Sequence, residues 1–422
     1  MNQRRYLVVS SDCHAGQPTE FYRPYLESKY LEAFDAFLKQ RDQMQALRQS
    51  QKQENEEFVE TWFGENEEGL TGGWEAGVRD RELDRDGVAA EVIFPDSDAV
   101  LGSTAAPFGA GLGLGGGGSD PELQLAGARA YNRWLAELCQ DSPERRVGLA
   151  LMPILSDQDA AVREIRSAFE SGLRGLMIPA MWNDFAPYHD RVYDKVWDVA
   201  QELDMPLHTH TGVGPVAEYG PYFGIGTAEY AFWASRPLSF LLWSGVFDRF
   251  PRLKFVTTEA GCYWLADLLW RWDMVYDREF GAAKLSGITQ YISKRPSAYV
   301  DSNFWAGASN TKERELLRRY EIGIDNIMWG SDFPHPEGSW PNTKKRLRES
   351  LWDIPVDETR RILGESALDN VYSHLDRSAL RELADTIGPT PEELGQTDEV
   401  DLTKWDKLKA AGRPWITHQS PV

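Results

Sequence analysis

The sequence has only three cysteines, Cys13, Cys139 and Cys262, spread over 422 residues. Thiols this few and this scattered exclude a disulfide framework and a zinc knuckle, which favours a reducing compartment. No run of about 18 or more apolar residues occurs, so we expect no membrane-spanning helix. The N-terminus also lacks a long apolar stretch with a small-residue cleavage site, and the sequence therefore predicts a cytoplasmic protein.

Positive charge is scarce as well. The chain carries 45 Lys and Arg against 66 Asp and Glu, which gives a formal net charge of −21. A surplus of acid repels phosphate backbones and argues against nucleic acid as a partner. Hydrophobic residues at 42% and charged residues at 26% are the proportions of a globular protein with a sizeable core.

Eight short apolar runs alternate with longer amphipathic stretches, and each run ends in polar, Gly or Pro residues. This alternation is typical of parallel strands wrapped by helices, and eight such units predict a TIM-type (β/α)8 barrel. The alternative is an open doubly wound sheet, but no Gly-rich phosphate turn follows the first run. The runs are residues 6–11, 90–95, 147–153, 174–179, 205–210, 253–259, 297–303 and 326–332.

We predict one barrel domain over residues 1–375, with insertions at about 20–85 and 96–125, and a C-terminal arm at 376–422. The arm is expected to pack over the barrel or onto a partner subunit. In the second case the chain would form a homodimer.

Two stretches inside the insertions stand out. Residues 31–60 are rich in Gln and Glu and predict a solvated helix after the first strand. Residues 101–118 are rich in glycine, but they lack the helix start and the acidic residue that a nucleotide-binding loop requires. A lid or a flexible insertion is the simpler interpretation of this glycine-rich loop.

The chain holds seven histidines, and five of them lie near predicted strand ends. His14 follows the first strand, His208 and His210 end the fifth, His335 lies just beyond the eighth, and His189 follows the fourth. In a TIM barrel the C-terminal strand ends form the active-site face, so the spacing predicts that these imidazoles gather at one mouth.

Carboxylates occur at the same strand ends. Asp12 precedes His14 by two residues, so both side chains point to the same side of an extended segment. Taken singly, each of these histidines and carboxylates is explained as a turn, a cap or an ordinary polar residue. Together, however, the five predicted metal ligands fall at four strand ends of one face. Imidazole and carboxylate together suit Zn, Fe or Mn, and we predict one or two divalent transition metal ions per chain. The predicted ligands are Asp12, His14, His210, Glu259 and Asp332.

Four sequence blocks resemble the amidohydrolase superfamily over residues 5–375: SSDCHAGQP, LHTHTGVG, TTEAGCYWL and MWGSDFPHPEG. The similarity is to the amidohydrolase-related branch, which also contains metal-dependent decarboxylases of aromatic and aminomuconate-type acids. The resemblance implies that Asp12 and His14 are the metal ligands of the first strand and His210 that of the fifth. It also implies that Asp332 binds the metal and handles the proton.

The sequence departs from the family pattern in three places. Asp12 stands where the first histidine of strand one is usual, Glu259 replaces the usual histidine of strand six, and no lysine ends the fourth strand in RGLMIP. Three carboxylates shift the metal preference toward Fe or Mn and favour two cations over one. Glu259 would then bridge, with His335, His189 or His208 completing a second site; alternatively it orients His210 from outside the ligand set.

The chain has 16 tryptophans, most of which we assign to packing. Trp182 and Trp305 are nevertheless predicted to contact an apolar or aromatic substrate. Asn303, which ends the predicted seventh strand, is a third candidate for substrate contact, although turn chemistry explains it equally well.

The function that we expect first is a metal-dependent hydrolase of an amide, ester or thioester of an apolar or aromatic carboxylic acid. The cation activates water and Asp332 takes its proton, with His335 and His208 as further catalytic groups. The alternative is non-oxidative decarboxylation of an aromatic or dienoic acid, with Asp332 protonating the ring carbon. A decarboxylase needs a cation for the carboxylate, and no arginine follows a strand end as clearly as the histidines do, which favours hydrolysis slightly. A non-catalytic metal-binding scaffold would require a closed, inert site.

Overall fold

Eight parallel strands form a nearly closed barrel in the computed structural model of the chain, which describes residues 4–50, 56–96, 104–112, 114, 120–278, 280–396 and 403–417. The strands are hydrogen-bonded in sequence order from β1 to β8. The backbone N–H of Asp332 donates to the carbonyl of Asp12 (2.8 Å) and that of His14 to Phe333 (2.6 Å), which joins the first and last strands. The predicted TIM barrel is confirmed. Its strands are β1 (Val9–Ala15), β2 (Ala90–Pro95), β3 (Arg146–Leu151), β4 (Gly175–Met177), β5 (Leu207–His210), β6 (Phe255–Thr258), β7 (Phe304–Ser309) and β8 (Ile327–Gly330).

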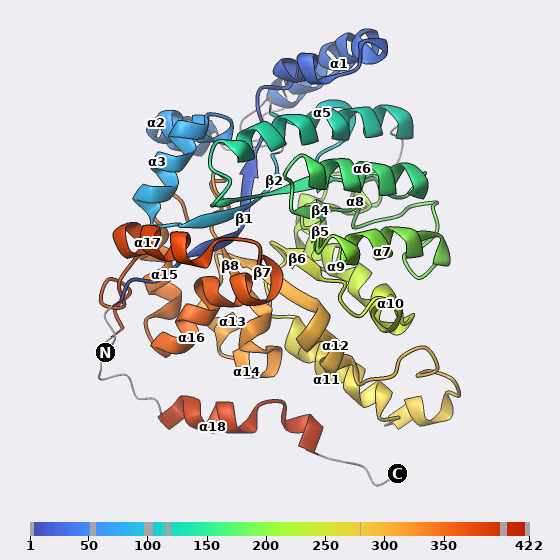
Figure 1. Cartoon of the computed structure of the whole chain (residues 1–422), viewed down its shortest axis with the longest axis vertical. Coiled ribbons are helices and arrows are strands. Elements are labelled where there is room, and N and C mark those ends of the chain that lie inside the picture. The colour runs from blue at the N-terminus through green and yellow to red at the C-terminus, as the bar shows by residue number, and fades with distance from the viewer. Residues whose placement is uncertain are drawn as a thin grey trace.

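Helices surround the strands, as Figure 1 shows. The two longest helices on the β2–β4 side begin at carboxylate caps: Asp120 accepts from the backbone of Glu122 at the start of α5, and Asp157 from that of Ala160 at the start of α6. Because helices cover the outside and side chains fill the inside, almost every strand residue is buried, as expected for a parallel sheet. The helices that follow the strands are α5 (Pro121–Gln140), α6 (Gln158–Glu170), α7 (Asp194–Glu202), α8 (Val216–Tyr219), α9 (Phe223–Trp243), α10 (Val246–Arg249), α11 (Leu265–Tyr276), α12 (Pro296–Asn303), α13 (Glu313–Leu316), α14 (Arg319–Ile322), α15 (Thr343–Leu351) and α16 (Val356–Arg360).

The predicted seventh strand is wrong. Residues 297–303 form the helix α12, and β7 begins directly after it. Pro296 occupies the start of α12, a position where its fixed φ suits a helix and its missing N–H costs no hydrogen bond. Asn303 therefore lies at the N-terminal end of β7, where its side-chain amide donates to the carbonyls of Pro251 (3.1 Å) and Leu253 (2.8 Å). The prediction that Asn303 contacts substrate is wrong, because this is the opposite end of the barrel from the active-site face.

The insertion between β1 and β2 contains three helices, α1 (Leu31–Ser50), α2 (Glu56–Leu70) and α3 (Ala76–Asp86). The described part of the glycine-rich loop packs against this insertion. The ring centroid of Phe108 lies 6.0 Å from that of Phe34 and 5.4 Å from that of Phe37, and the Thr104 hydroxyl donates to Asp96. Residues 104–110 are thus anchored instead of forming a free insertion, and residues 101–103, 113 and 115–118 of the loop lie outside the described part of the chain.

The C-terminal arm contains α17 (Arg377–Ile387) and α18 (Thr403–Ala411) and packs onto the barrel. The carbonyl of Pro389 accepts from the backbone of Tyr6 (2.8 Å), and the buried side chain of Gln396 donates to the carbonyl of Leu351 (2.9 Å). The guanidinium of Arg319 lies 4.1 Å from the ring centroid of the buried Trp405. None of the described helices is long and apolar enough to cross a membrane.

Candidate metal centre

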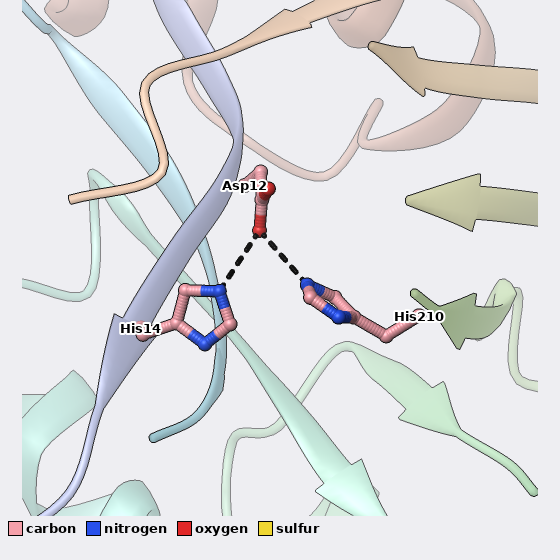
Figure 2. Close-up of side chains that lie close together, drawn as sticks. All are labelled: Asp12, His14 and His210. Atoms are coloured by element: carbon pink, nitrogen blue, oxygen red, sulfur yellow. Dashed lines mark hydrogen bonds and ion pairs between the residues drawn. The ribbon is translucent and has the colours of Figure 1, made fainter. Parts of the chain in front are cut away.

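The strand ends bring Asp12, His14 and His210 together at the barrel mouth (Figure 2). The Nε2 atoms of His14 and His210 each lie 3.4 Å from Oδ1 of Asp12, and all three side chains are buried. Asp12 and His14 project to the same side of β1, as their two-residue spacing predicts. The pairing register of β1 with β2 shifts between Ser10 and Cys13, an irregularity that is common beside active sites because it re-aims side chains.

The other nitrogen of each imidazole fixes its tautomer. Nδ1 of His14 lies 2.8 Å from the carbonyl oxygen of Pro95, and Nδ1 of His210 lies 3.1 Å from that of Thr211. Since a carbonyl only accepts hydrogen bonds, each Nδ1 carries a proton, and each Nε2, once it is deprotonated, presents a lone pair toward Asp12. Two nitrogen lone pairs and a carboxylate oxygen that face one another repel unless a cation lies between them.

Asp332 adds a further carboxylate to this group. It follows β8, and its Oδ1 lies 3.3 Å from Nε2 of His14. Both atoms are buried, and neither has a hydrogen-bond partner among the described residues. Buried polar atoms without partners are rare in native proteins, and a bound ion is one ordinary explanation. Two imidazole nitrogens and two carboxylates therefore fit a divalent transition metal such as Zn, Fe or Mn.

His335 lies between two carboxylates, one of which the sequence reasoning missed. Its Nε2 lies 3.1 Å from Oδ1 of Asp96, and its Nδ1 lies 2.9 Å from Oδ1 of Asp332. Its ring also stacks on that of His14, with centroids 3.9 Å apart. The signal for Asp96 was present, because this residue directly follows the second apolar run, just as Asp332 follows the eighth.

Carboxylates control the protonation of this cluster. Burial and the neighbouring His335 would lower the pKa of His14, but the nearby carboxylates of Asp12 and Asp332 raise it to about 10. Burial likewise opposes the charge of His335, yet Asp332 and Asp96 hold its pKa well above the usual value. The pKa of Asp332 is lowered, because the neighbouring His335 and His14 outweigh its burial. A metal ion that binds His14 must therefore displace the proton on its Nε2.

Glu259 borders the cluster without joining the closest group. Its Oε2 lies 3.6 Å from Nδ1 of His210, and it forms a looser group with Asp332 and Glu337. Burial, together with the charges of Asp332 and Asp12, raises the pKa of Glu259 well above its usual value. Its proposed role as a bridging ligand stays a prediction.

A cavity of about 1280 Å³ opens beside the cluster and is lined by residues that follow β5, β6, β7 and β8. Glu259 and His335 form part of its wall. The remaining walls come from α9, with Phe223 and Tyr230, and from the segment after β7, with Lys312.

Four candidates from the sequence do not line this cavity. His208 points inside the barrel one layer below His210, where Tyr372 Oη lies 2.8 Å from its Nε2 and burial lowers its pKa to about 3. Trp305 also faces the interior, four residues before Ser309, whose hydroxyl donates to Asp12. Trp182 packs outside on Phe240, with ring centroids 4.5 Å apart, and His189 stacks on the same ring. These side chains are placed for packing, and the structure does not bring them to the metal cluster.

The sequence of this chain is similar to those of known proteins. The model of the family described as Amidohydrolase matches residues 97–369. The gamma-resorcylate decarboxylase of Polaromonas sp. is 30% identical over 226 residues, which cover 49% of this chain and 65% of that protein. The chain thus matches slightly less than two thirds of the length of this curated relative.

Solved structures share the fold at lower identity. An amidohydrolase from Mycobacterium avium subsp. paratuberculosis superposes with a TM-score of 0.62 at 18% identity, over 87% of this chain and 99% of that one. A 5-carboxyvanillate decarboxylase from Novosphingobium aromaticivorans, solved with bound manganese, superposes with a TM-score of 0.63 at 17% identity, over 86% of this chain and 96% of that one.

Proposed function

The chain belongs to the amidohydrolase family, and from that premise we propose that it is a metal-dependent non-oxidative decarboxylase of an aromatic acid. The curated relative from Polaromonas is a decarboxylase of gamma-resorcylate, which favours this alternative over the hydrolysis that the sequence suggested first.

The observation that carries the proposal is the position of His335 between Asp96 and Asp332. Both ring nitrogens face a carboxylate, at 3.1 and 2.9 Å, and ionised carboxylates only accept hydrogen bonds. His335 therefore holds two protons and is cationic. A decarboxylase must supply a proton to the carbon that loses CO2, whereas a hydrolase needs a free base to accept one from water. An imidazolium ion at the cavity wall suits the first reaction.

The metal-binding part of the mechanism belongs to the strand-end ligands. Asp12, His14 and His210 would hold the ion, with Asp332 beside them. Manganese suits this oxygen-rich donor set, and a manganese ion is bound in the 5-carboxyvanillate decarboxylase of similar fold. When bound, the ion supplies positive charge that binds and orients the acidic groups of the substrate.

Proton transfer is assigned to His335. The proton on its Nδ1 moves to the ring carbon that carries the carboxylate, and the carbon–carbon bond to that carboxylate then breaks. The electron pair of this bond returns to the ring and restores its aromaticity, while CO2 leaves. Asp96 holds the far nitrogen and keeps the imidazolium oriented, and the charge of Asp332, whose Oδ1 lies 2.9 Å from Nδ1, stabilises the imidazolium until the proton moves. The net reaction consumes one proton and yields CO2 and an arene.

Product analysis tests the proposal. The manganese-loaded chain is incubated with gamma-resorcylate and 5-carboxyvanillate, each labelled at the carboxyl carbon, and in parallel with their methyl esters. We expect labelled CO2 and the matching arene from at least one acid, and neither product from the His14→Ala variant. Release of methanol from the esters without any CO2 from the acids would show that the chain is a hydrolase.

A further inference from the structure

The cavity is large for a substrate with a single ring. Its volume of about 1280 Å³ exceeds the range of roughly 300–1,000 Å³ that is usual for small-molecule sites. Glu259 and His335, which mark the reacting centre, form only part of the wall. The remaining lining must therefore serve either solvent or a part of the substrate that extends beyond the reacting ring.

Part of this lining is cationic and lacks counter-ions. Lys312 directly precedes α13 and Arg314 lies in its first turn, both with exposed side chains, and neither forms an ion pair with a carboxylate in the described parts of the chain. Arg318, which lines the same cavity, shows the contrast, because it pairs with Asp267 and Glu321, each at 2.7 Å.

Two acidic residues neighbour these cations: Glu313, which is exposed and forms no ion pair with either of them in the described structure, and Glu315, which is already engaged. Oε1 of Glu315 accepts from the backbone N–H of Cys262 (2.8 Å), and its Oε2 accepts from the backbone N–H of Lys312 (2.9 Å). Lys312 and Arg314 therefore have no carboxylate partner within the described structure. Their charges are free to bind an anion that enters from solvent.

Aromatic side chains line the same space. Phe223 on α9 is 77% exposed and Tyr263, after β6, is 55% exposed, although both side chains are large and apolar. Exposed aromatic groups that surround a cavity are typical of ligand-binding grooves. They suit a flat or apolar segment of ligand that runs from the reacting ring toward the two cations.

We propose that Lys312 and Arg314 bind a second carboxylate of the substrate, carried on a substituent that extends beyond the ring bearing the reacting carboxylate. This inference rests on the proposed function, since the first carboxylate is the one lost at the metal centre. The substrate class is thus an elongated aromatic dicarboxylic acid instead of a simple hydroxybenzoic acid.

Binding measurements test this inference without turnover. The probes are a benzoate that carries a carboxylate at the end of a flexible ether chain, and its methyl ester at that end only, which has almost the same length but no distal charge. Both are titrated calorimetrically into the manganese-loaded wild-type chain, into Lys312→Gln/Arg314→Gln, and into a matched control, Lys345→Gln/Arg346→Gln. The control pair is exposed on α15, does not line the cavity, and changes the net charge by the same amount.

We expect the wild-type and control chains to bind the diacid about three- to tenfold more tightly than the ester, as for two solvent-exposed charge pairs. The cavity variant should lose this preference while keeping its affinity for the ester. A diacid preference that survives in the cavity variant, falls equally in the control, or is absent from the wild type would overturn the inference.

The binding assay and the product assay test the two proposals independently, so either proposal can be refuted while the other is supported. Diacid preference that depends on Lys312 and Arg314, in a chain that releases no CO2, would support the anion site and refute the decarboxylase. CO2 release from a chain with no diacid preference would support the decarboxylase and refute the anion site.

Discussion

Asp96→Asn tests whether His335 is the proton donor. The substitution keeps the shape of the side chain and removes one negative charge beside Nε2 of His335, 3.1 Å away. An asparagine oxygen still accepts from this nitrogen, so the ring keeps its orientation while the imidazolium loses part of its stabilisation. Asp96 contacts none of the three strand-end ligands, and the metal content should therefore stay unchanged.

The magnitude follows from the change in hydrogen-bond type. A hydrogen bond between two charged groups contributes about 1.5–3 kcal/mol, whereas a bond to a neutral acceptor contributes about 1 kcal/mol. The difference of about 0.5–2 kcal/mol lowers the proton affinity of His335 roughly 2- to 30-fold, so kcat should fall by this factor at pH values above the pKa of His335. Both partners are buried, so solvent does not screen this effect.

The pH dependence gives a second readout. Asp96 raises the pKa of His335, and the reaction requires the protonated imidazole. Activity is therefore lost as the pH rises through this pKa. In Asp96→Asn the pKa is lower, so the loss should begin at a lower pH than in the wild type.

The assay is CO2 release at saturating substrate across the pH range, with metal content measured on the same samples. Thr104→Val is the matched control, because it removes the hydroxyl that donates to Asp96 but keeps the carboxylate. It should change kcat by less than about threefold, since only a neutral donor is lost. Wild-type kcat together with an unshifted pH profile in Asp96→Asn would refute the assignment of the proton to His335.

Three other substitutions separate metal binding from stability. His14→Ala should lose both metal and activity, by about 100-fold or more, while circular dichroism stays native; full activity would contradict its role as a ligand. Glu259→Gln should lower metal occupancy if the side chain is a ligand, and unchanged occupancy by elemental analysis would restrict Glu259 to an outer position. Burial raises the pKa of Asp86 to about 6. Asp86→Asn should therefore raise the free energy of unfolding by about 2–3 kcal/mol near pH 8 and leave it unchanged near pH 4. Urea denaturation at the two pH values measures this difference. The sign follows from proton binding: between the unfolded pKa near 4 and the folded value, the folded chain binds more protons, so the wild type loses stability as the pH rises. An equal gain at both pH values would contradict this reasoning.

The barrel could be predicted from the sequence because its strands are buried on both sides. Such strands appear as short continuous apolar runs, and seven of the eight predicted runs overlap an observed strand. The seventh could not be found in this way. Residues 297–303 contain a short apolar stretch like that of a strand but follow Pro296 into a helix, whereas β7 has the sequence FWAGAS, whose small residues carry little strand signal. Gly307 is required there, because a side chain would approach Thr258 Oγ1 to 3.1 Å and Ser11 Oγ to 3.3 Å.

Part of the site was predictable for an equally simple reason. Asp12, His14 and His210 lie within strands or at their last residue, so barrel geometry alone brings them together. The contact between His335 and Asp96 joins residues 239 positions apart, on loops whose paths no local pattern specifies. The conformations of these loops decide which polar residues near a strand end reach the cavity.

Two carboxylates that lie just past their strand ends show how loop conformation places a polar side chain at the cavity. Glu259 and Asp332 both adopt left-handed backbone conformations, with φ of 58° and 60°. For residues other than glycine this conformation costs about 1–2 kcal/mol, and it persists only where the surroundings enforce it. Here they do, because the N–H of Glu259 donates to Gly307 (2.9 Å) and that of Asp332 to Asp12 (2.8 Å), so each residue extends the ladder of hydrogen bonds beyond its strand. Glycine would remove the cost at both positions but would also remove the carboxylate. The strained backbone is therefore best explained by the two acidic side chains that it positions beside Asp12, His14 and His210, where regular strand geometry would not place them.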